Sequence, residues 1–410
     1  MIVAVIFHST NVLAVGCNDA SSADQVSAKN QDLQLIRRNG NLAQQRLHAW
    51  EIIGGLTREQ PLLERWYGEE QVFAEISEAT HPSGIHGFSR AAGSDVIRPR
   101  SDSADPAIFS YTLYNEAAYL HIQCNKLNRI SELERLRGMA EPDTGVPGDR
   151  SIPSFPADAI VMKTVWWPVA HDGLTPLPVW DADRNPPRKS GNDYTTWQRV
   201  VAIDPSPTGR RGGIVQVDFA AQSFPDASRV SLKDFHFVAV DRDMALRTMR
   251  DPSARKAAVI ALGREVREGD YLILVGASLA TREISDWIWV TFWWHDHPEQ
   301  GPFAVGRPRD LIGVWRNYLM ATAFDSNLPA STDGGPHICF NPWLEGRFPD
   351  GGRGGGRVSN CMACHSRASY PAIGFLPVTR GAPDLKGDPA YASGRLRTSF
   401  LWAISLHARP

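Results

Sequence analysis

Two tryptophan-rich apolar runs constrain the fold of this chain more than any other feature. Residues 159–169 read AIVMKTVWWPV and residues 287–294 read WIWVTFWW, and both contain a Thr-x-Trp-Trp sequence that leads into a His-Asp turn. Short runs rich in β-branched and aromatic residues, bounded by turn residues, are typical of buried strands. We therefore expect two equivalent strands in the core of a β-rich fold.

Weaker patterns surround these two runs. Further strand-like segments are expected at 109–123, 197–203, 214–219, 234–240 and 271–277. Apolar residues at helical spacing predict helices at 32–53, 61–75, 127–136, 252–262 and 310–324, the first of them ending at Gly54-Gly55. Many short strands with long connections predict a mainly β fold with helical additions, either a β-sandwich or an open barrel.

Composition places the chain among folded proteins and excludes a general affinity for nucleic acid. The 410 residues are 42% hydrophobic and 21% charged, and the formal net charge is only −2. From residue 340 onward, nine Lys and Arg residues face four Asp and Glu residues. The C-terminal part is therefore basic, and it could neutralise an anionic ligand or dock an acidic partner.

The N-terminus predicts export. Residues 1–17 form an apolar run that ends in small residues before Cys17, which resembles a bacterial lipoprotein leader. An ordinary secretory leader is the alternative, because residues 1–7 contain no Lys or Arg. We expect a periplasmic protein, with a polar tether at 18–31 and, if Cys17 is lipidated, a membrane anchor.

The motif that indicates chemistry is Cys361-Met362-Ala363-Cys364-His365. In C-x-x-C-H, two thiols can add to the vinyl groups of a porphyrin, and the adjacent imidazole can ligate its iron. A zinc site would need further ligands at metal-binding spacing nearby, and a thioredoxin-like dithiol would need a βαβ context, neither of which the sequence offers. This segment resembles the c-type cytochromes.

The resemblance implies one covalently attached haem c in a small α-helical haem segment at 341–410, following a β-rich aromatic domain at 32–340. Cys361 and Cys364 would attach the haem, and His365 would be the proximal iron ligand. In such proteins a downstream proline carbonyl often accepts the second N–H of the proximal histidine, and Pro377 or Pro371 could do so here. The residues proposed to bind the haem propionates are Arg367, Arg395 and Arg397.

The sequence alone does not identify the sixth iron ligand. Small c-type cytochromes usually supply a downstream methionine, but none follows Met362. His407 is the single downstream histidine and a candidate distal ligand, whereas His295 and His297 are candidate distal catalytic residues that could accept a proton from a bound oxidant. An unfilled sixth position is the remaining possibility.

Two cysteines lie outside the leader and the motif. In an oxidising compartment Cys124 and Cys339 could form a disulfide, and two buried thiols are the equal alternative.

The function expected from these features is that of an exported single-haem oxidoreductase, acting on a small-molecule oxidant or substrate or with a redox partner protein. One alternative is an electron-transfer cytochrome with a six-coordinate haem that serves a dehydrogenase. A second is a β-rich binding module whose haem is structural or sensory.

Overall fold

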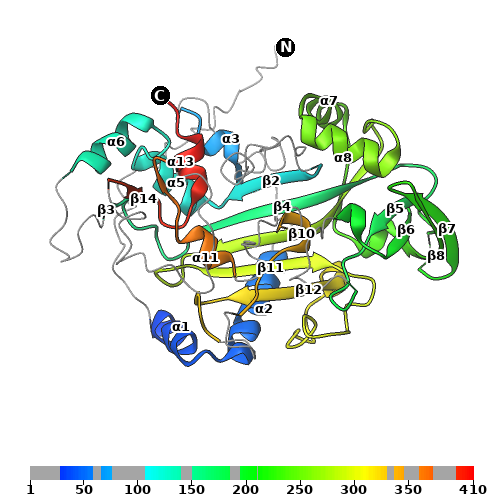
Figure 1. The fold of residues 1–410 in the computed structure, drawn as a ribbon, viewed down its shortest axis with the longest axis horizontal. Coiled ribbons are helices and arrows are strands. Elements are labelled where there is room, and N and C mark those ends of the chain that lie inside the picture. The colour runs from blue at the N-terminus through cyan, green and yellow to red at the C-terminus, as the bar shows by residue number, and fades with distance from the viewer. Residues whose placement is uncertain are drawn as a thin grey trace, which may run out of the picture.

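A large antiparallel sheet organises the structure (Figure 1). The computed structural model describes residues 28–58, 66–75, 107–139, 150–184, 194–209, 211–329, 337–345, 360–372 and 394–410. The sheet has seven strands in the order β1-β2-β4-β10-β11-β12, with β9 paired to part of β10. The strands are β1 (Tyr67–Gly68), β2 (Phe109–Tyr114), β4 (Ile160–Val169), β9 (Phe237–Ala239), β10 (Tyr271–Thr281), β11 (Ile288–Trp294) and β12 (Tyr318–Ala323).

The two tryptophan-rich runs are the central strands β4 and β11, as expected. Both pair antiparallel with β10, which lies between them. Gly276 in β10 permits a close approach, because a Cβ at this position would lie 3.2 Å from the side-chain amide oxygen of Asn341. The centre of the sheet is therefore built from strands that are buried on both faces.

A row of polar residues crosses this apolar sheet. Thr112 pairs with Lys163, Lys163 pairs with Ser278, and Ser278 pairs with Thr291, so the four side chains share one face. The hydroxyl of Ser278 donates to that of Thr291 over 3.0 Å. Lys163 and Ser278 are partly exposed, whereas the other interior residues of β4 and β10 are buried. Lys163 and Ser278 thus form a polar pair in the middle of the apolar sheet.

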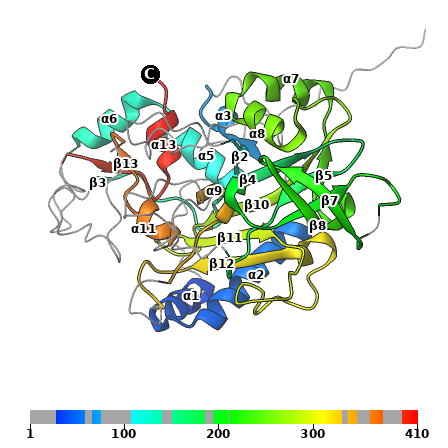
Figure 2. The ribbon, with the colours of Figure 1, turned by 45° about the vertical axis from the view of Figure 1, so that its right-hand side comes forward.

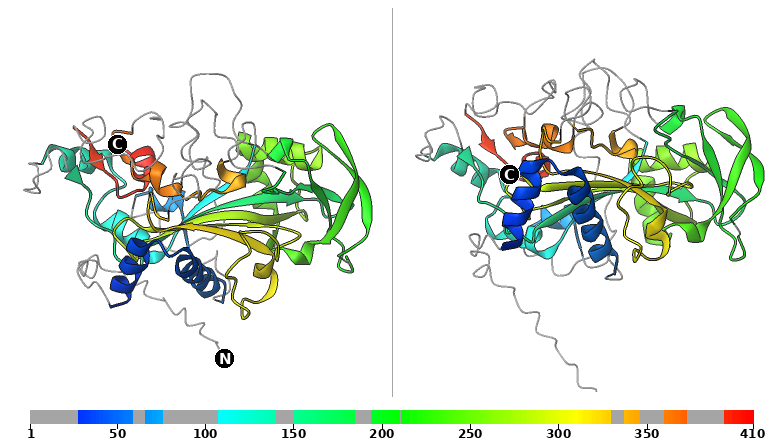
Figure 3. Two further views of the ribbon diagram at one scale, coloured as in Figure 1. Left: turned by 60° about the horizontal axis from the view of Figure 1, so that its bottom comes forward. Right: turned by 90° about the horizontal axis from the view of Figure 1, so that it is seen from below.

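Helices pack against the sheet from more than one side. Helix α2 packs on β12, and α8 packs on β2 and β4. Figure 3 shows α1 and α2 on one side of the sheet and α11 on the other. The helices are α1 (Ala28–Asn39), α2 (Leu42–Arg58), α3 (Glu69–Val72), α5 (Glu116–Cys124), α6 (Ile130–Gly138), α7 (Arg242–Arg250), α8 (Pro252–Leu262), α9 (Pro342–Glu345), α11 (Cys361–His365) and α13 (Trp402–His407).

Two smaller sheets complete the described part of the fold (Figure 2). One contains β5 (Thr175–Pro178), β6 (Val200–Asp204), β7 (Ile214–Phe219) and β8 (Gln222–Ser231), and the other contains β3 (Arg150–Ser151), β13 (Ser369–Tyr370) and β14 (Leu396–Arg397). In the latter, β14 pairs in parallel with β3, so C-terminal residues share a sheet with much earlier ones. Strand pairing therefore joins residues on both sides of the domain boundary that is expected between residues 340 and 341.

The structure confirms a β-rich fold with antiparallel sheets and helical additions. The large sheet is open over the described residues, with β1 and β12 at its edges, and helices rather than a second large sheet pack on it. The helix at 252–262 is confirmed as α8.

Several local predictions were wrong. Segment 310–324 forms a 3₁₀ turn (Gly313–Asn317) followed by β12, because its apolar residues are buried by strand pairing rather than on one helical stripe. Segment 109–123 is β2 followed by α5, which begins where Asn115 caps the backbone N–H of Ala118. The first predicted helix is two helices separated at Gly40, whose φ is 59°, and the second helix continues past Gly54-Gly55.

Candidate functional site

Helix α11 carries the whole C-x-x-C-H motif. Its N-cap is Asn360, whose side-chain oxygen accepts the backbone N–H of Met362 over 3.1 Å. The Asn360 amide donates to the carbonyls of Asp325 and Ser326 over 3.0 and 3.1 Å. This fully buried side chain therefore starts the helix and ties it to the segment that follows β12.

The imidazole of His365 is held in one orientation. Its Nδ1 lies 2.8 Å from the carbonyl oxygen of Phe400, and its ring lies 4.2 Å from the indole of Trp289, between centroids. A carbonyl oxygen can only accept, so Nδ1 carries the proton and Nε2 presents its lone pair. Burial lowers the pKa of His365 to about 4, which keeps the ring neutral and able to bind a metal at neutral pH.

The carbonyl of Phe400 is aimed by an unusual turn. Ser399 and Phe400 have φ values of 50° and 68°, a left-handed conformation that non-glycine residues rarely adopt. The hydroxyl of Thr398 donates to the carbonyl of Leu401 over 2.9 Å, and the indole of Trp287 donates to Ser399 over 3.3 Å. These bonds maintain a strained backbone that orients the acceptor of His365, and strain of this kind often marks functional positions.

The two motif thiols face different neighbours. The Sγ of Cys361 lies 3.9 Å from the Sγ of Cys339, whereas the Cys364 thiol lies near the side chain of Trp402 in α13. The contact with Cys339, together with burial, raises the pKa of Cys361, and burial raises that of Cys364 to about 11. Both groups are therefore protonated thiols at neutral pH.

Lys163 extends from the sheet on the side that carries α11. Trp289, which contacts His365, pairs with Ala280 of β10, and Ala280 pairs with Val161, two residues before Lys163 on β4. Side chains two residues apart on a strand share a face, so Lys163 and Trp289 point to the same side of the sheet. Burial lowers the pKa of Lys163 to about 8, although the nearby Glu69 opposes the shift. Within the part of the chain that the structure describes, its ammonium group forms no hydrogen bond or ion pair.

The C-terminal basic residues lie around the motif with varied partners. Arg367 is buried, Arg397 lies in β14 where burial lowers its pKa, and Arg395 donates to the carbonyl of Pro371 over 3.1 Å. Pro377 lies outside the described residues. The acceptor for His365 is thus Phe400, which the expected proline pattern did not indicate, while the Pro371 carbonyl binds an arginine.

His407 lies on α13 near an acidic group. Its Nε2 is 3.5 Å from a carboxylate oxygen of Glu69, and its ring lies 5.6 Å from that of Phe73. Glu69 also affects the pKa values of Lys163 and Tyr114, so these polar groups lie within electrostatic range of one another.

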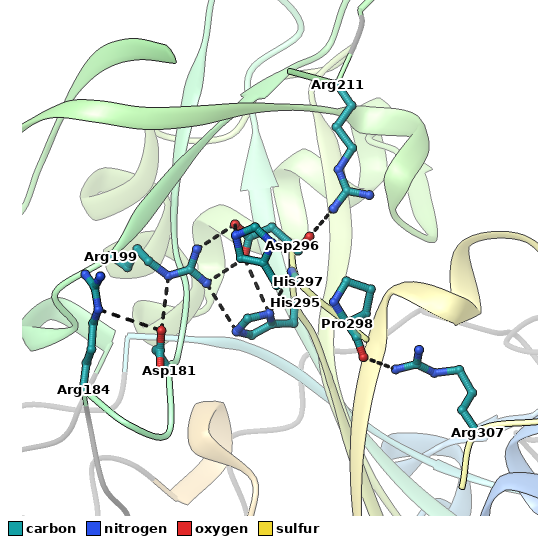
Figure 4. Close-up of polar contacts among 9 residues, drawn as sticks. All are labelled: Asp181, Arg184, Arg199, Arg211, His295, Asp296, His297, Pro298 and Arg307. Atoms are coloured by element: carbon teal, nitrogen blue, oxygen red, sulfur yellow. Dashed lines mark hydrogen bonds and ion pairs between the residues drawn. The ribbon is translucent and has the colours of Figure 1, made fainter. Parts of the chain in front are cut away.

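The expected distal residues His295 and His297 belong to a different cluster (Figure 4). The guanidinium of Arg199 donates two 2.7 Å hydrogen bonds to Asp296, and Nδ1 of His295 accepts the backbone N–H of His297 over 2.9 Å. Burial lowers the pKa of His295 to about 4. His295 lies six residues beyond Trp289 along β11, or about 20 Å, so the structure does not bring this cluster to His365.

A cavity of about 610 Å³ lies beside this cluster. Arg211 and Arg316 contribute positive charge to its lining, and Asp296 and Glu299 contribute negative charge. Arg211 donates to the backbone carbonyl of Asp296, and Arg316 pairs with Glu299 over 3.5 Å. Arg316 and Glu299 are thus paired with each other and Asp296 with Arg199, whereas Arg211 donates to a neutral backbone carbonyl.

The expected disulfide between Cys124 and Cys339 is wrong. Cys124 is disulfide-bonded, but Cys339 is a free, fully buried thiol next to Cys361. Cys339 cannot be the partner of Cys124, because its neighbour in space is the first cysteine of the motif.

The described residues contain no group of three or more His, Cys, Asp and Glu side chains that could hold a metal ion. Among the same residues, no helix is long and apolar enough to cross a membrane. The leader at 1–17, with Cys17, lies outside the described residues.

No family model, curated protein or solved structure matches this chain.

Proposed function

We propose that this chain is an exported oxidoreductase that carries one haem, attached covalently through Cys361 and Cys364, with His365 as the proximal iron ligand. The observation that carries the proposal is the 2.8 Å hydrogen bond from Nδ1 of His365 to the Phe400 carbonyl. A histidine that ligates a metal commonly donates its other ring N–H to such an acceptor, which fixes the tautomer and strengthens the ligating nitrogen.

The surroundings of α11 suit a haem in three further respects. The imidazole of His365 is neutral, the two thiols belong to one short helix, and the ammonium of Lys163 faces the same side of the sheet and forms no hydrogen bond or ion pair among the described residues. Lys163 and Arg397 would neutralise the two propionates of a haem. The resemblance to c-type cytochromes proposes the same role for Arg367 and Arg395.

Each of these residues would perform a distinct task. His365 would bind the iron through Nε2, Phe400 would fix the ring orientation, and Trp289 would exclude water from one face of the imidazole. Bound haem would supply reversible one-electron chemistry at its iron, with a potential tuned by the axial ligands and by burial.

The sixth coordination position is proposed to accept a small oxidant or substrate. His295 and His297 lie about 20 Å along β11 from the residue that contacts His365, so neither is near the proximal ligand. His407 has Glu69 as its neighbour at 3.5 Å. We propose periplasmic action with a redox partner protein or a small oxidant, in agreement with the leader sequence.

Haem staining of a denaturing gel tests the attachment site. The wild-type chain, produced with haem-maturation factors, should stain covalently, and the double variant Cys361→Ala with Cys364→Ala should not. Cys339→Ala is the matched control, because it removes a buried thiol outside the motif and should retain the stain. Equal staining of the double variant and the wild type would refute the proposal.

Optical spectra test the iron ligands. His365→Gly should lose the wild-type Soret position, and added imidazole should restore it, whereas His407→Gly should leave the spectrum unchanged. A high-spin ferric spectrum and rapid binding of carbon monoxide are expected for an open sixth position. A low-spin spectrum that carbon monoxide does not change would indicate an electron-transfer cytochrome instead.

A further inference from the structure

A third thiol adjoins the first cysteine of the motif. The Sγ atoms of Cys339 and Cys361 are 3.9 Å apart, and the side chains are 0% and 7% exposed. Cys364, the other motif cysteine, lies near Trp402. The Cys361 thiol therefore has a neighbouring sulfur that lies 22 residues before it in the sequence, outside its own C-x-x-C.

Backbone contacts hold the two cysteines as neighbours. Cys339 forms an isolated parallel bridge with Asn360, the residue before Cys361. The Asn360 amide also donates to the carbonyl of His337 over 3.4 Å, and the Cys361 thiol points to the carbonyl of Cys339 over 3.5 Å. A disulfide needs a sulfur separation of about 2 Å, so the thiols must approach by about 2 Å.

We propose that Cys339 and Cys361 form a reversible disulfide in the chain before haem attachment, by exchange with an external disulfide. The exchange begins when local opening exposes one of the two cysteines and its thiol loses a proton; this thiolate attacks the external disulfide R–S–S–R, which forms a mixed disulfide and releases one RSH after protonation. The other thiolate then attacks the mixed disulfide and releases the second RSH. The two cysteines lose two electrons and two protons in total, the external disulfide gains them, and an external dithiol reverses the reaction.

The effect of this disulfide on haem attachment rests on the proposed function. While Cys361 is bonded to Cys339 it has no thiol to add to a vinyl group, although Cys364 and His365 remain free. Attachment of haem at both cysteines therefore requires prior reduction of this bond. The disulfide with Cys339 protects the first motif thiol from further oxidation, such as to sulfinic acid, while the haem-free chain is in an oxidising compartment.

Peptide mapping of the full chain tests the disulfide without any haem. The chain is produced in a host compartment that lacks haem maturation, incubated with oxidised glutathione, denatured with an alkylating reagent and digested with trypsin. Arg347 and Arg357 separate the Cys339 peptide from the one that contains both motif cysteines. We expect a cross-linked pair of these peptides, with Cys364 alkylated, and its loss after treatment with a dithiol.

Two variants assign the bond. Cys364→Ser should still give the cross-link, whereas Cys361→Ser should abolish it. A disulfide between Cys361 and Cys364 in the wild type, or alkylation of all three cysteines under oxidising conditions, would overturn the proposal. The wild-type measurement stands alone if a variant fails to fold.

Haem staining separates this proposal from the proposed function. A cross-link together with persistent staining of the doubly substituted motif would refute haem attachment and leave the disulfide intact. Absence of the cross-link, with staining that depends on the motif, would refute the disulfide alone. Under oxidising maturation Cys339→Ser should yield at least about twofold less haem-loaded protein than the wild type, because Cys361 loses its protection, and an equal or higher yield would refute the protective role.

Discussion

Replacement of Lys163 by methionine should stabilise the haem-free protein at neutral pH. The ammonium group extends from the centre of β4, and no hydrogen bond or ion pair of this group occurs among the described residues. Burial of a charge without a partner is unfavourable, and methionine keeps a side chain of similar length without the charge.

The size of the stabilisation expected from Lys163→Met follows from the pKa of Lys163, which burial lowers from 10.5 to about 8. Each pKa unit corresponds to about 1.4 kcal/mol, so the folded state holds the charged form at a cost of about 3 kcal/mol. Because the folded pKa is the lower one, the unfolded chain binds more protons between the two values, and stability rises with pH over that window. The penalty is complete below pH 8 and disappears above pH 10.5.

Urea unfolding of the haem-free chain checks this expectation. Lys163→Met should raise the free energy of unfolding by about 2–3 kcal/mol at pH 7 and by less than about 1 kcal/mol at pH 10. Lys233→Met is the matched control, because Lys233 is an exposed lysine whose ammonium donates to the carbonyl of Pro207. The control should show almost no change at either pH.

A lower stability of Lys163→Met at pH 7, or a gain that does not vary with pH, would refute the reasoning. In the haem-loaded protein the same substitution should stabilise less, because a propionate would pair with the ammonium. If Lys163→Met raises the free energy of unfolding by the same amount in the haem-loaded protein, the role proposed for Lys163 is wrong. This result would not bear on the proposed attachment site.

Three further substitutions test how the site is supported. Asn341→Ala should cost about 2–4 kcal/mol in urea unfolding, because its amide donates to Thr291 and to two backbone carbonyls in the sheet, and a cost below about 1 kcal/mol would contradict this. Arg46→Met should cost a similar amount by the same assay, since three backbone carbonyls each lose a hydrogen bond from the guanidinium, and an unchanged midpoint would count against it. Burial opposes ionisation of Asp270, but hydrogen bonds from Arg264 and His171 outweigh it and lower its pKa. Asp270→Asn should therefore destabilise the protein at pH 7, and the difference from the wild type should shrink as the pH falls below about 4, whereas a constant difference would be the contrary result.

Prediction from sequence succeeded where a pattern is local. The runs at 159–169 and 287–294 are strands because their β-branched and aromatic residues suit a sheet that is buried on both faces. Prediction failed at 310–324, where apolar residues at helical spacing became a strand in register with β11. Strand pairing joins residues far apart in the chain, and no local periodicity reports it.

At the candidate site, too, the sequence specified the local groups and the tertiary structure specified their neighbours. The sequence alone determined the C-x-x-C-H motif, and with it the thiols and the imidazole, because the chemistry requires these residue types at adjacent positions. Only the tertiary structure decided which groups surround them: the Phe400 carbonyl on His365, the Cys339 thiol next to Cys361, and Lys163 on the same side of the sheet. These partners come from a strained turn, a backbone bridge and the sheet register, which depend on contacts between distant segments that a sequence pattern does not encode.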